Sequence, residues 1–265
     1  KHIQELEAAY QTRLFDRQGS RISLTESGNL LLEHCERILE DYKRLEYEMH
    51  LLHNEYTGGL KLGASTTIAQ YVLPPLLASF IGKFPQVSLS LLNGNSREIE
   101  AALQEHRIDL GFVEGVFRLP NIRYTTFLED ELVAVVRTGS KLAVGEEITP
   151  DELFHLPLVL RERGSGTLDV FERALQQHNI KLSSLQVLMY LGSTESIKLF
   201  LEHTDCLGIV SVRSITRELY SGQLRVVEIK GMPMLRDFSF AQPQGQESGL
   251  AQVFMQFAMH NNHKL

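Results

Sequence analysis

A heptad repeat of apolar residues within residues 26–56 constrains the fold of this chain more than any other feature. Two apolar series, each with a seven-residue spacing, interleave along the segment, and charged residues occupy the other positions. An apolar stripe of this period predicts one long helix that packs against a partner helix, as in a coiled coil. A helix packed on its own domain is the alternative. The residues expected to form a dimer interface are Leu31, Cys35, Ile38, Tyr42, Leu45, Met49 and Leu52.

Residues 58–265 show a second pattern, an alternation of strand-like and helix-like segments. Thr57, Gly58 and Gly59 end the long helix and separate it from this region. The alternation predicts a doubly wound α/β architecture with parallel sheets, and about 200 residues suffice for two small lobes. The strand-like segments are residues 60–65, 87–94, 108–115, 131–140, 156–166 and 208–213. The helix-like segments are residues 66–84, with a kink expected at Pro74 and Pro75, and residues 96–107, 167–179 and 194–204.

The charge balance and the cysteine count exclude several classes of protein. With 26 Lys and Arg residues against 33 Asp and Glu residues, the net charge of −7 excludes a basic footprint for nucleic acid over the whole chain, although not a local basic patch. No apolar run reaches the ~18–20 residues that span a membrane, and the chain does not begin with a signal peptide. The two cysteines, Cys35 and Cys206, exclude a disulfide-rich scaffold and an all-cysteine zinc site. These features predict a cytoplasmic protein.

Sequence motifs of common enzymes are absent. The chain contains no H-E-x-x-H, G-x-S-x-G, G-x-G-x-x-G or G-x-x-x-x-G-K-[ST] motif, and its 10 histidines are scattered. We therefore expect no enzymatic activity, no metal site and no cofactor.

Four predicted turns between a strand and a helix carry small hydroxyl or amide side chains. In open α/β sheets, ligands bind beyond the carboxyl ends of the strands, where helix N-termini offer free N–H groups and a positive dipole end. Several such turns facing one cleft form an anion site, whereas helix capping alone is the alternative for each turn. Beside the turns, we expect Arg161 to pair with an anion or with Glu162, and Glu114 to accept a proton from a ligand or to cap a loop. The turns contain Ser65, Thr66, Thr67, Asn95, Ser96, Ser165, Thr167, Ser193 and Thr194.

The N-terminal part of the chain predicts a short helix followed by a two-stranded ribbon. Apolar residues recur at helical spacing from the start with no N-cap before them, so we expect a further segment upstream. Residues 11–24 predict the ribbon, with Arg17 and Arg21 near its tip. Thr25 is the expected N-cap of the long helix.

The motifs I-x-x-L-E, L-F-x-R and G-x-x-x-x-L-T-x-x-G follow one another within residues 1–32. In this combination the segment resembles the second half of the winged helix-turn-helix of LysR-type transcriptional regulators. The resemblance extends over the whole chain and implies the C-terminal part of a winged helix-turn-helix in residues 1–25, a dimerising linker helix in residues 26–57 and an effector-binding domain in residues 58–265. That domain would be similar to two-lobed periplasmic solute-binding proteins, with lobe I at about 58–132 and 234–265 and lobe II at about 133–233.

Further motifs resemble those of regulators tied to inorganic sulfur, including sulfite-responsive ones, and to carbon fixation. They are A-S-T-T-I-A-Q-Y-V-L-P, G-N-S, F-V-E-G, L-E-D-E-L-V, L-R-E-R-G-S-G-T and G-S-T-E-S-I-K. This likeness implies that a small anion or metabolite, such as sulfite or a related sulfur anion, binds between the lobes. The implied effector site contains the turn residues named above together with Glu114, Arg161 and Glu195. The subgroup often has an Arg directly after G-S-G-T where this chain has Leu168, so one positive charge expected near the ligand is missing.

The resemblance also implies a homodimer or homotetramer that binds promoter DNA, with RNA polymerase as a further candidate partner and no membrane partner. Lys1, at the end of the implied recognition helix, and Arg17 and Arg21, near the wing, are the expected DNA contacts. Two alternatives use the same cleft, namely a solute-binding protein and a small-anion enzyme. The first would carry a secretion or lipid-anchor signal and no heptad helix, and the second would carry a nucleophile–base pair or a metal-ligand set.

Overall fold

The computed structural model describes residues 2–18, 21–53, 56–116, 118–142, 145, 147–244 and 249–261. The chain divides into two compact units, residues 1–55 and residues 56–265. Within the described residues, no helix is long and apolar enough to cross a lipid bilayer.

The first unit consists of α1 (His2–Tyr10), β1 (Phe15–Gln18), β2 (Arg21–Leu24) and α2 (Glu26–His53). The strands β1 and β2 pair antiparallel, so the predicted ribbon is confirmed. The predicted N-cap is confirmed as well, because the backbone N–H of Gly28 donates to Thr25 Oγ1 at 3.0 Å. Lys1 and the side chains of Arg17 and Arg21 lie outside the described residues, so their assignment as DNA contacts stays a prediction.

The α2 helix carries the heptad stripe on its exposed surface. Ile38 and Leu45 are 66% and 55% exposed, and Tyr42 and Met49 are also exposed. Helices in proteins gain most of their stability from burying an apolar face, so a stripe this exposed favours a partner helix. The side chain of Leu52 lies outside the described residues, and dimerisation through the stripe stays a prediction.

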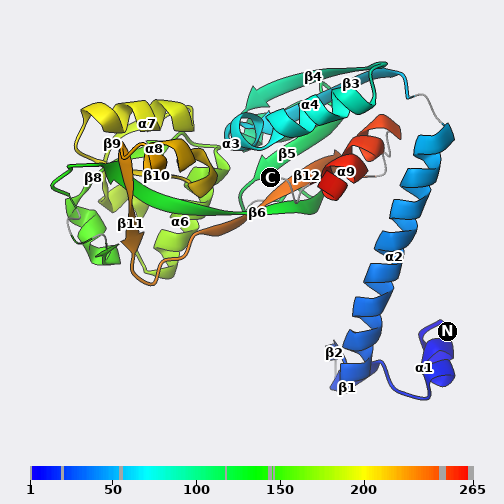
Figure 1. Ribbon diagram of the computed structural model, residues 1–265. Coiled ribbons are helices and arrows are strands. Elements are labelled where there is room, and N and C mark those ends of the chain that lie inside the picture. The colour runs from blue at the N-terminus through cyan, green and yellow to red at the C-terminus, as the bar shows by residue number, and fades with distance from the viewer. Residues whose placement is uncertain are drawn as a thin grey trace. The chain divides into compact units, whose positions relative to one another are not determined.

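In the second unit, most strands join one continuous mixed sheet (Figure 1). Its order is β4 (Val87–Gly94), β3 (Gly58–Ser65), β5 (Leu110–Glu114), β12 (Leu235–Pro243), β6 (Ile122–Arg137), β10 (Leu207–Ser211), β8 (Pro157–Arg161) and β9 (Gln186–Leu191). The strand β11 (Leu224–Ile229) pairs with β6 and with the short β7 (Glu147–Ile148).

The expectation of parallel sheets alone is wrong. The strands β3, β4 and β5 pair parallel at one end of the sheet, and β8, β9 and β10 pair parallel at the other. Between these groups, β12 runs antiparallel to both β5 and β6, and β6 runs antiparallel to β10. The long strand β6 and its partner β12 therefore form the connection between two α/β lobes.

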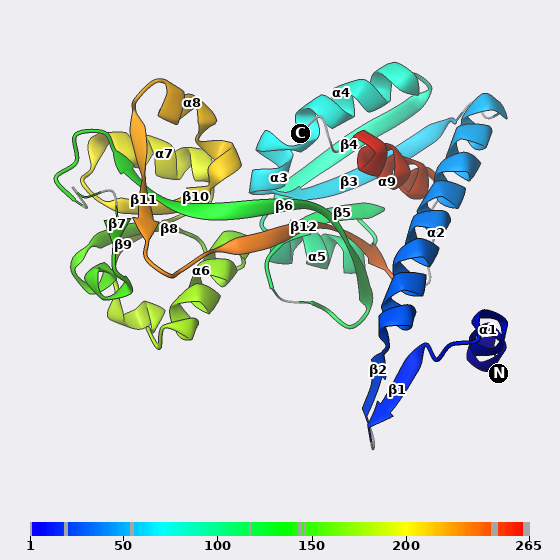
Figure 2. The same ribbon diagram turned by 60° about the horizontal axis from the view of Figure 1, so that its bottom comes forward.

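Helices cover both faces of each lobe (Figure 2). In the lobe built on β3, β4 and β5, Figure 2 shows α3 (Thr66–Tyr71) and α4 (Leu73–Lys83) above the sheet and α5 (Ser96–Gln104) below it. In the other lobe, α7 (Thr194–His203) and α8 (Thr216–Tyr220) lie above and α6 (Gly166–Gln177) lies below.

The expected kink at Pro74 is a break between two helices, because α3 ends before Val72 and Pro74 lies in the first turn of α4. Short 3₁₀ helices at Pro150–His155, Leu182–Ser184 and Val212–Ser214 also belong to the lobes.

Aromatic rings join the C-terminal helix α9 (Gly249–Asn261) to the first lobe. The ring of Phe80 on α4 lies 4.8 Å from Phe254 and 5.2 Å from Phe257, measured between centroids. Phe112 on β5 lies 5.1 Å from Phe240 on β12 in the same core. Contacts between aromatic rings stabilise this packing in addition to the free energy gained by removing their apolar surface from water. The helix α9 therefore packs on the first lobe, and the lobe boundaries stay predictions.

We predict that Ile38→Lys combined with Leu45→Lys prevents self-association of the chain. Two ammonium groups placed in the apolar stripe would have to be buried without partners in a coiled coil. Light scattering measures the mass, and we expect that of a monomer for the double variant. Glu33→Lys, on the opposite side of the same helix, is the matched control and leaves the wild-type mass unchanged. A wild-type mass for the double variant would contradict the coiled-coil assignment.

Candidate functional site

The carboxylate of Glu114, at the end of β5, accepts hydrogen bonds from hydroxyls of a neighbouring turn. Ser65 Oγ donates to one carboxylate oxygen at 2.9 Å, and Thr67 Oγ1 donates to the other at 3.2 Å. Both hydroxyls stand where β3 meets α3, and all three side chains are buried. Ser96 Oγ, at the start of α5, donates to the backbone carbonyl of Glu114 at 2.8 Å. Three of the predicted site residues therefore meet at Glu114, itself a predicted site residue, and two of them, Ser65 and Thr67, stabilise its negative charge.

Arg236 on β12 supplies the cation of this cluster. Its Nη1 lies 3.2 Å from Glu114 Oε1, and its Nε donates to Asp130 Oδ2 at 2.7 Å. Nη1 also donates to Thr167 Oγ1 at 3.0 Å, which brings in the start of α6. The side chains of Arg236, Glu114 and Asp130 are at most 1% exposed, so the guanidinium and both carboxylates interact with little screening by water. One side chain on a connecting strand thus binds residues of both lobes.

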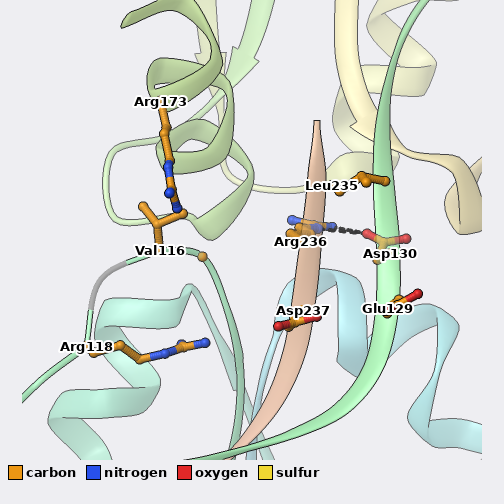
Figure 3. A pocket seen from close by; sticks show the side chains of 9 residues that line it. Val116, Arg118, Glu129, Asp130, Arg173, Leu235, Arg236 and Asp237 are labelled. Carbon is orange, nitrogen blue, oxygen red and sulfur yellow. Dashed lines mark hydrogen bonds and ion pairs between the residues drawn. The ribbon is translucent and has the colours of Figure 1, made fainter. Parts of the chain in front are cut away.

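Further side chains hold Asp130 in place on β6. Ser211 Oγ donates to Asp130 Oδ1 at 2.7 Å, and Arg213 Nε lies 3.6 Å from the same oxygen. Figure 3 shows the pairing of Arg236 with Asp130 across the two connecting strands. Sequence reasoning missed Arg236, because no strand was predicted around it. Asp130 lies within the L-E-D-E-L-V motif, which was the one signal available for it.

The lobes also touch through glycines beside this cluster. A Cβ at Gly166 would lie 2.3 Å from the backbone oxygen of Glu114, and a Cβ at Gly115 would lie 3.1 Å from Gly166 Cα. Gly115 has a φ of +117°, a conformation that L side chains rarely adopt. The backbone N–H of Arg97 in addition donates to the carbonyl of Gly164 at 3.3 Å. Only residues without a side chain allow the two lobes to approach this closely.

A second polar cluster joins the lobes on the side of α3 and α7. Tyr71, the last residue of α3, donates its hydroxyl to Glu195 in the first turn of α7. Lys198 Nζ lies 2.7 Å from Glu195, 2.8 Å from Glu218 and 2.9 Å from the backbone oxygen of Ser214. The same ammonium lies 5.3 Å from the centre of the Tyr71 ring. Of these groups the sequence analysis had singled out Glu195 alone.

Burial and charge fix the protonation states in this second cluster. Burial, helped by the hydrogen bond to Glu195, raises the pKa of Tyr71 far above its ordinary value. Burial acts to raise the pKa of Glu195, but hydrogen bonds from Lys198 and Tyr71 hold that pKa below its ordinary value. Tyr71 therefore remains a donor and Glu195 an anionic acceptor at neutral pH.

Arg161, at the end of β8, is a fully buried cation that retains one unused donor. Its Nε and Nη2 donate to Glu162 at 2.8 and 3.0 Å, so the predicted pairing with Glu162 is present. Among the described residues, its Nη1 finds no hydrogen-bond partner although it is buried. The charge of Arg161 acts to lower the pKa of Tyr71, which indicates that Arg161 lies near the second cluster. The loop that leads into α7 is adjacent, because the N–H of Glu162 donates to the carbonyl of Leu191 at 3.2 Å.

Several other predicted site residues serve as helix caps in this structure. Asn95 forms a capping box with Glu98 at the start of α5, and Ser165 and Ser193 accept the capping hydrogen bonds of α6 and α7. Thr66 Oγ1 donates to the carbonyl of Gly94 at 3.1 Å. Thr194 is buried within the first turn of α7. Capping, the alternative considered from the sequence, thus describes Asn95, Ser165 and Ser193, and their place in an effector site stays a prediction.

Leu168, which stands where an Arg was expected from the resemblance, is 2% exposed and lies within the hydrophobic core under α6. A guanidinium reaches this turn instead from Arg236, which donates to the preceding residue, Thr167. Among the described residues, no three His, Cys, Asp or Glu side chains gather as a metal ion would need.

Comparison with known proteins identifies relatives of the chain. A family model described as LysR substrate binding domain matches residues 53–262. YeiE of Escherichia coli K12, described as an uncharacterized HTH-type transcriptional regulator, is 34% identical over 227 residues, which cover 86% of this chain and 75% of that protein. CysL of Bacillus subtilis, an HTH-type transcriptional regulator, is 26% identical over 239 residues, which cover 90% of this chain and 79% of that protein.

A solved structure confirms the architecture of the second unit. The regulatory domain of CcmR from Synechocystis PCC6803, in complex with 2-PG, matches with a TM-score of 0.70 and 28% sequence identity. The match covers 77% of this chain and 97% of the CcmR chain. The two-lobed α/β domain expected from the sequence is therefore present.

We predict that Arg236→Met lowers the free energy of unfolding by about 3–5 kcal/mol, because it leaves two buried carboxylates without their cation. Urea denaturation measures the change. Adding Asp130→Asn to this variant removes one of the two charges and should recover part of the loss. A loss below about 1 kcal/mol in the single variant would show that Glu114 and Asp130 do not depend on Arg236.

Asp169 makes the stability of the domain depend on pH. Asp169 lies on α6 and, with Arg97 and Glu100, lines a cavity of about 370 Å³ between α5 and α6. Burial raises the pKa of Asp169, against the opposing charge of Arg97. A raised pKa means that the folded protein holds this proton more firmly than the unfolded chain, so the contribution to stability is present below the unfolded pKa and lost as the pH rises through the folded one.

We therefore predict that Asp169→Asn raises the melting temperature at about pH 7 and that this gain disappears near pH 4. Thermal unfolding followed by circular dichroism at the two pH values measures the difference. Asp151→Asn, at an exposed position, is the control and changes the melting temperature little at either pH. A variant that is less stable than the wild type at neutral pH would contradict the direction of the pKa shift.

Proposed function

Because the chain belongs to the LysR family of transcriptional regulators, we propose that its two-lobed domain binds a small anionic effector between the lobes and thereby switches a DNA-bound oligomer. The effector that we favour is sulfite or a related sulfur anion. The oligomer is a homodimer or homotetramer in the cytoplasm, on promoter DNA with two-fold related half-sites. RNA polymerase is a further candidate partner.

The unused donor of Arg161 carries this proposal. A buried guanidinium nitrogen without a partner costs free energy that a bound oxyanion would recover through a charge-assisted hydrogen bond. Arg161 lies beside the loop that leads into α7, whose first N–H groups and positive dipole end also favour an anion. Since Arg161 is 1% exposed, the group that it binds is small and largely removed from water.

The other turn hydroxyls contribute less to an anion site in this conformation. Ser65 and Thr67 already donate to Glu114, so they bind an additional anion only after a rearrangement of that carboxylate. We therefore place the effector on the side of Arg161, Tyr71 and Glu195, and from the predicted set we assign Thr66 and Thr194 as its hydroxyl contacts.

Sulfur anions are favoured because of the motifs that the chain shares with sulfur-linked regulators. The CcmR domain was solved with 2-PG, which makes 2-PG a second candidate effector for this chain. The effector acts as a switch only through a difference in affinity between two arrangements of the lobes or of the oligomer. The contact between Tyr71 and Glu195 joins the lobes beside the proposed site, so its formation and loss distinguish two such arrangements.

A solute-binding protein or a small-anion enzyme would use the same cleft. The exposed heptad stripe on α2 favours a regulator, because neither alternative needs a dimerising helix before the two lobes. The relatives YeiE and CysL are both named transcriptional regulators. We propose no enzymatic activity for this chain.

We predict that one small anion raises the melting temperature of the protein as its concentration increases. The probes are sulfite, sulfate, thiosulfate, phosphate and 2-PG in a thermal-shift titration. A ligand at about 100 times its Kd stabilises the folded state by about 2.7 kcal/mol. Arg161→Gln should abolish the shift, whereas Arg107→Gln, at an exposed Arg paired with Glu105, should preserve it.

Two negative results would each reject a different part of the proposal, one the class of ligand and the other the binding residue. The absence of a shift with every probe would reject a small anionic effector. An undiminished shift in Arg161→Gln would reject Arg161 as the binding residue.

A further inference from the structure

A cavity of about 390 Å³ lies against the two connecting strands, on the side of α6. Arg236 and Asp237 of β12 and Glu129 and Asp130 of β6 line one side of it. The loop after β5 and Arg173 of α6 line the other side (Figure 3). Tyr71 and Glu195 belong to α3 and α7, which Figure 2 shows on the opposite face of the strands. The cavity is therefore separate from the proposed effector site, and we name it the hinge cavity.

The two walls of the hinge cavity carry opposite charges. Figure 3 shows Arg118 and Arg173 on one side, and Glu129 and Asp237 on the strands across from them. Arg236 and Asp130 neutralise each other within the wall. Among the described residues, none of the other four forms an ion pair. Arg118 donates to Ser239 Oγ at 3.3 Å and lies 4.4 Å from the centre of the Tyr124 ring. Asp237 accepts a 3.5 Å hydrogen bond from Thr126.

The acidic wall contains a pair of carboxylates on neighbouring strands, and within the described residues neither carboxylate forms an ion pair. In the antiparallel register of β12 and β6, Asp237 stands directly opposite Glu129. Like charges in such cross-strand pairs repel each other and destabilise the sheet. Because both side chains are exposed to the cavity and to solvent, a bound ammonium group could relieve this repulsion.

The chemistry of the two walls selects a ligand with one charge of each sign. A cavity of about 390 Å³ has room for an α-amino acid, a small ligand whose ammonium group and carboxylate suit walls of opposite charge. Val116 and Leu235 line the same cavity and offer apolar contact to an aliphatic side chain.

We propose that the hinge cavity binds an aliphatic α-amino acid. Arg118 and Arg173 bind its carboxylate, Glu129 and Asp237 bind its ammonium group, and Val116 and Leu235 contact its side chain. Arg173 belongs to α6, whereas Arg118 follows β5 of the other lobe, so the ligand bridges the lobes. It also lies beside Arg236, which couples it to the Glu114 cluster. The proposal does not depend on the proposed anionic effector.

The test is isothermal titration calorimetry of the full chain with L-leucine, isocaproate and isoamylamine. Isocaproate is leucine without the ammonium group, and isoamylamine is leucine without the carboxylate. We expect saturable binding of L-leucine and affinities at least about tenfold lower for both analogues, since each loses one charge-assisted contact. Absence of leucine binding, or equal binding of either analogue, would overturn the proposal.

Two variants locate the binding. Asp237→Asn and Arg173→Gln should each weaken leucine binding at least about tenfold, because each removes one charge from a wall of the cavity. Arg107→Gln and Asp151→Asn, at exposed positions outside the cavity, should bind as the wild type does. All variants change exposed side chains, and circular dichroism checks their folding. Wild-type affinity in both cavity variants would overturn the assignment of the site.

Discussion

The buried guanidinium of Arg236 is the interaction on which the arrangement of the lobes depends. It lies between Glu114 of one lobe, Thr167 of the other and Asp130 of a connecting strand. Buried ions in a low-dielectric interior are tolerated only when they are paired and hydrogen-bonded, so the hydroxyls of Ser65 and Thr67 have to donate to Glu114. The start of α3, the end of β5 and the start of α6 thus converge on one charge.

The two polar clusters have different roles, one in holding the lobes together and the other in the proposed binding of the effector. Arg236 holds the lobes together through ion pairs with Glu114 and Asp130, whereas Arg161, on the side of α3 and α7, retains a buried donor without a hydrogen-bond partner. A ligand that binds this donor also lies near the Tyr71–Glu195 contact between the lobes. Effector binding would therefore change the balance between lobe arrangements, which is what a regulator of the LysR family needs in order to respond to a small molecule.

Features with a local cause could be predicted from the sequence. The heptad spacing predicted α2, and the alternation of strands and helices predicted the parallel parts of both lobes. The antiparallel β12 was missed because a single strand carries no local signal of its partner or its direction. Arg236 was missed with it, and its role depends on Glu114 and Asp130, which lie more than a hundred residues earlier in the chain. The sequence predicted correctly that hydroxyl side chains stand at the starts of helices. It could not distinguish a helix cap, as at Ser165, from a donor to a buried carboxylate, as at Ser65.

The central claim is that a small sulfur anion binds beside Arg161 between the lobes. The most direct measurement is an anomalous difference map from crystals grown with selenite, the heavier analogue of sulfite. The account predicts one strong selenium peak beside Arg161, on the side of Tyr71 and α7. The selenite ion placed at this peak has an oxygen within hydrogen-bond distance of Arg161 Nη1. A map with no peak in the cleft, or with its main peak elsewhere in the domain, would contradict the account.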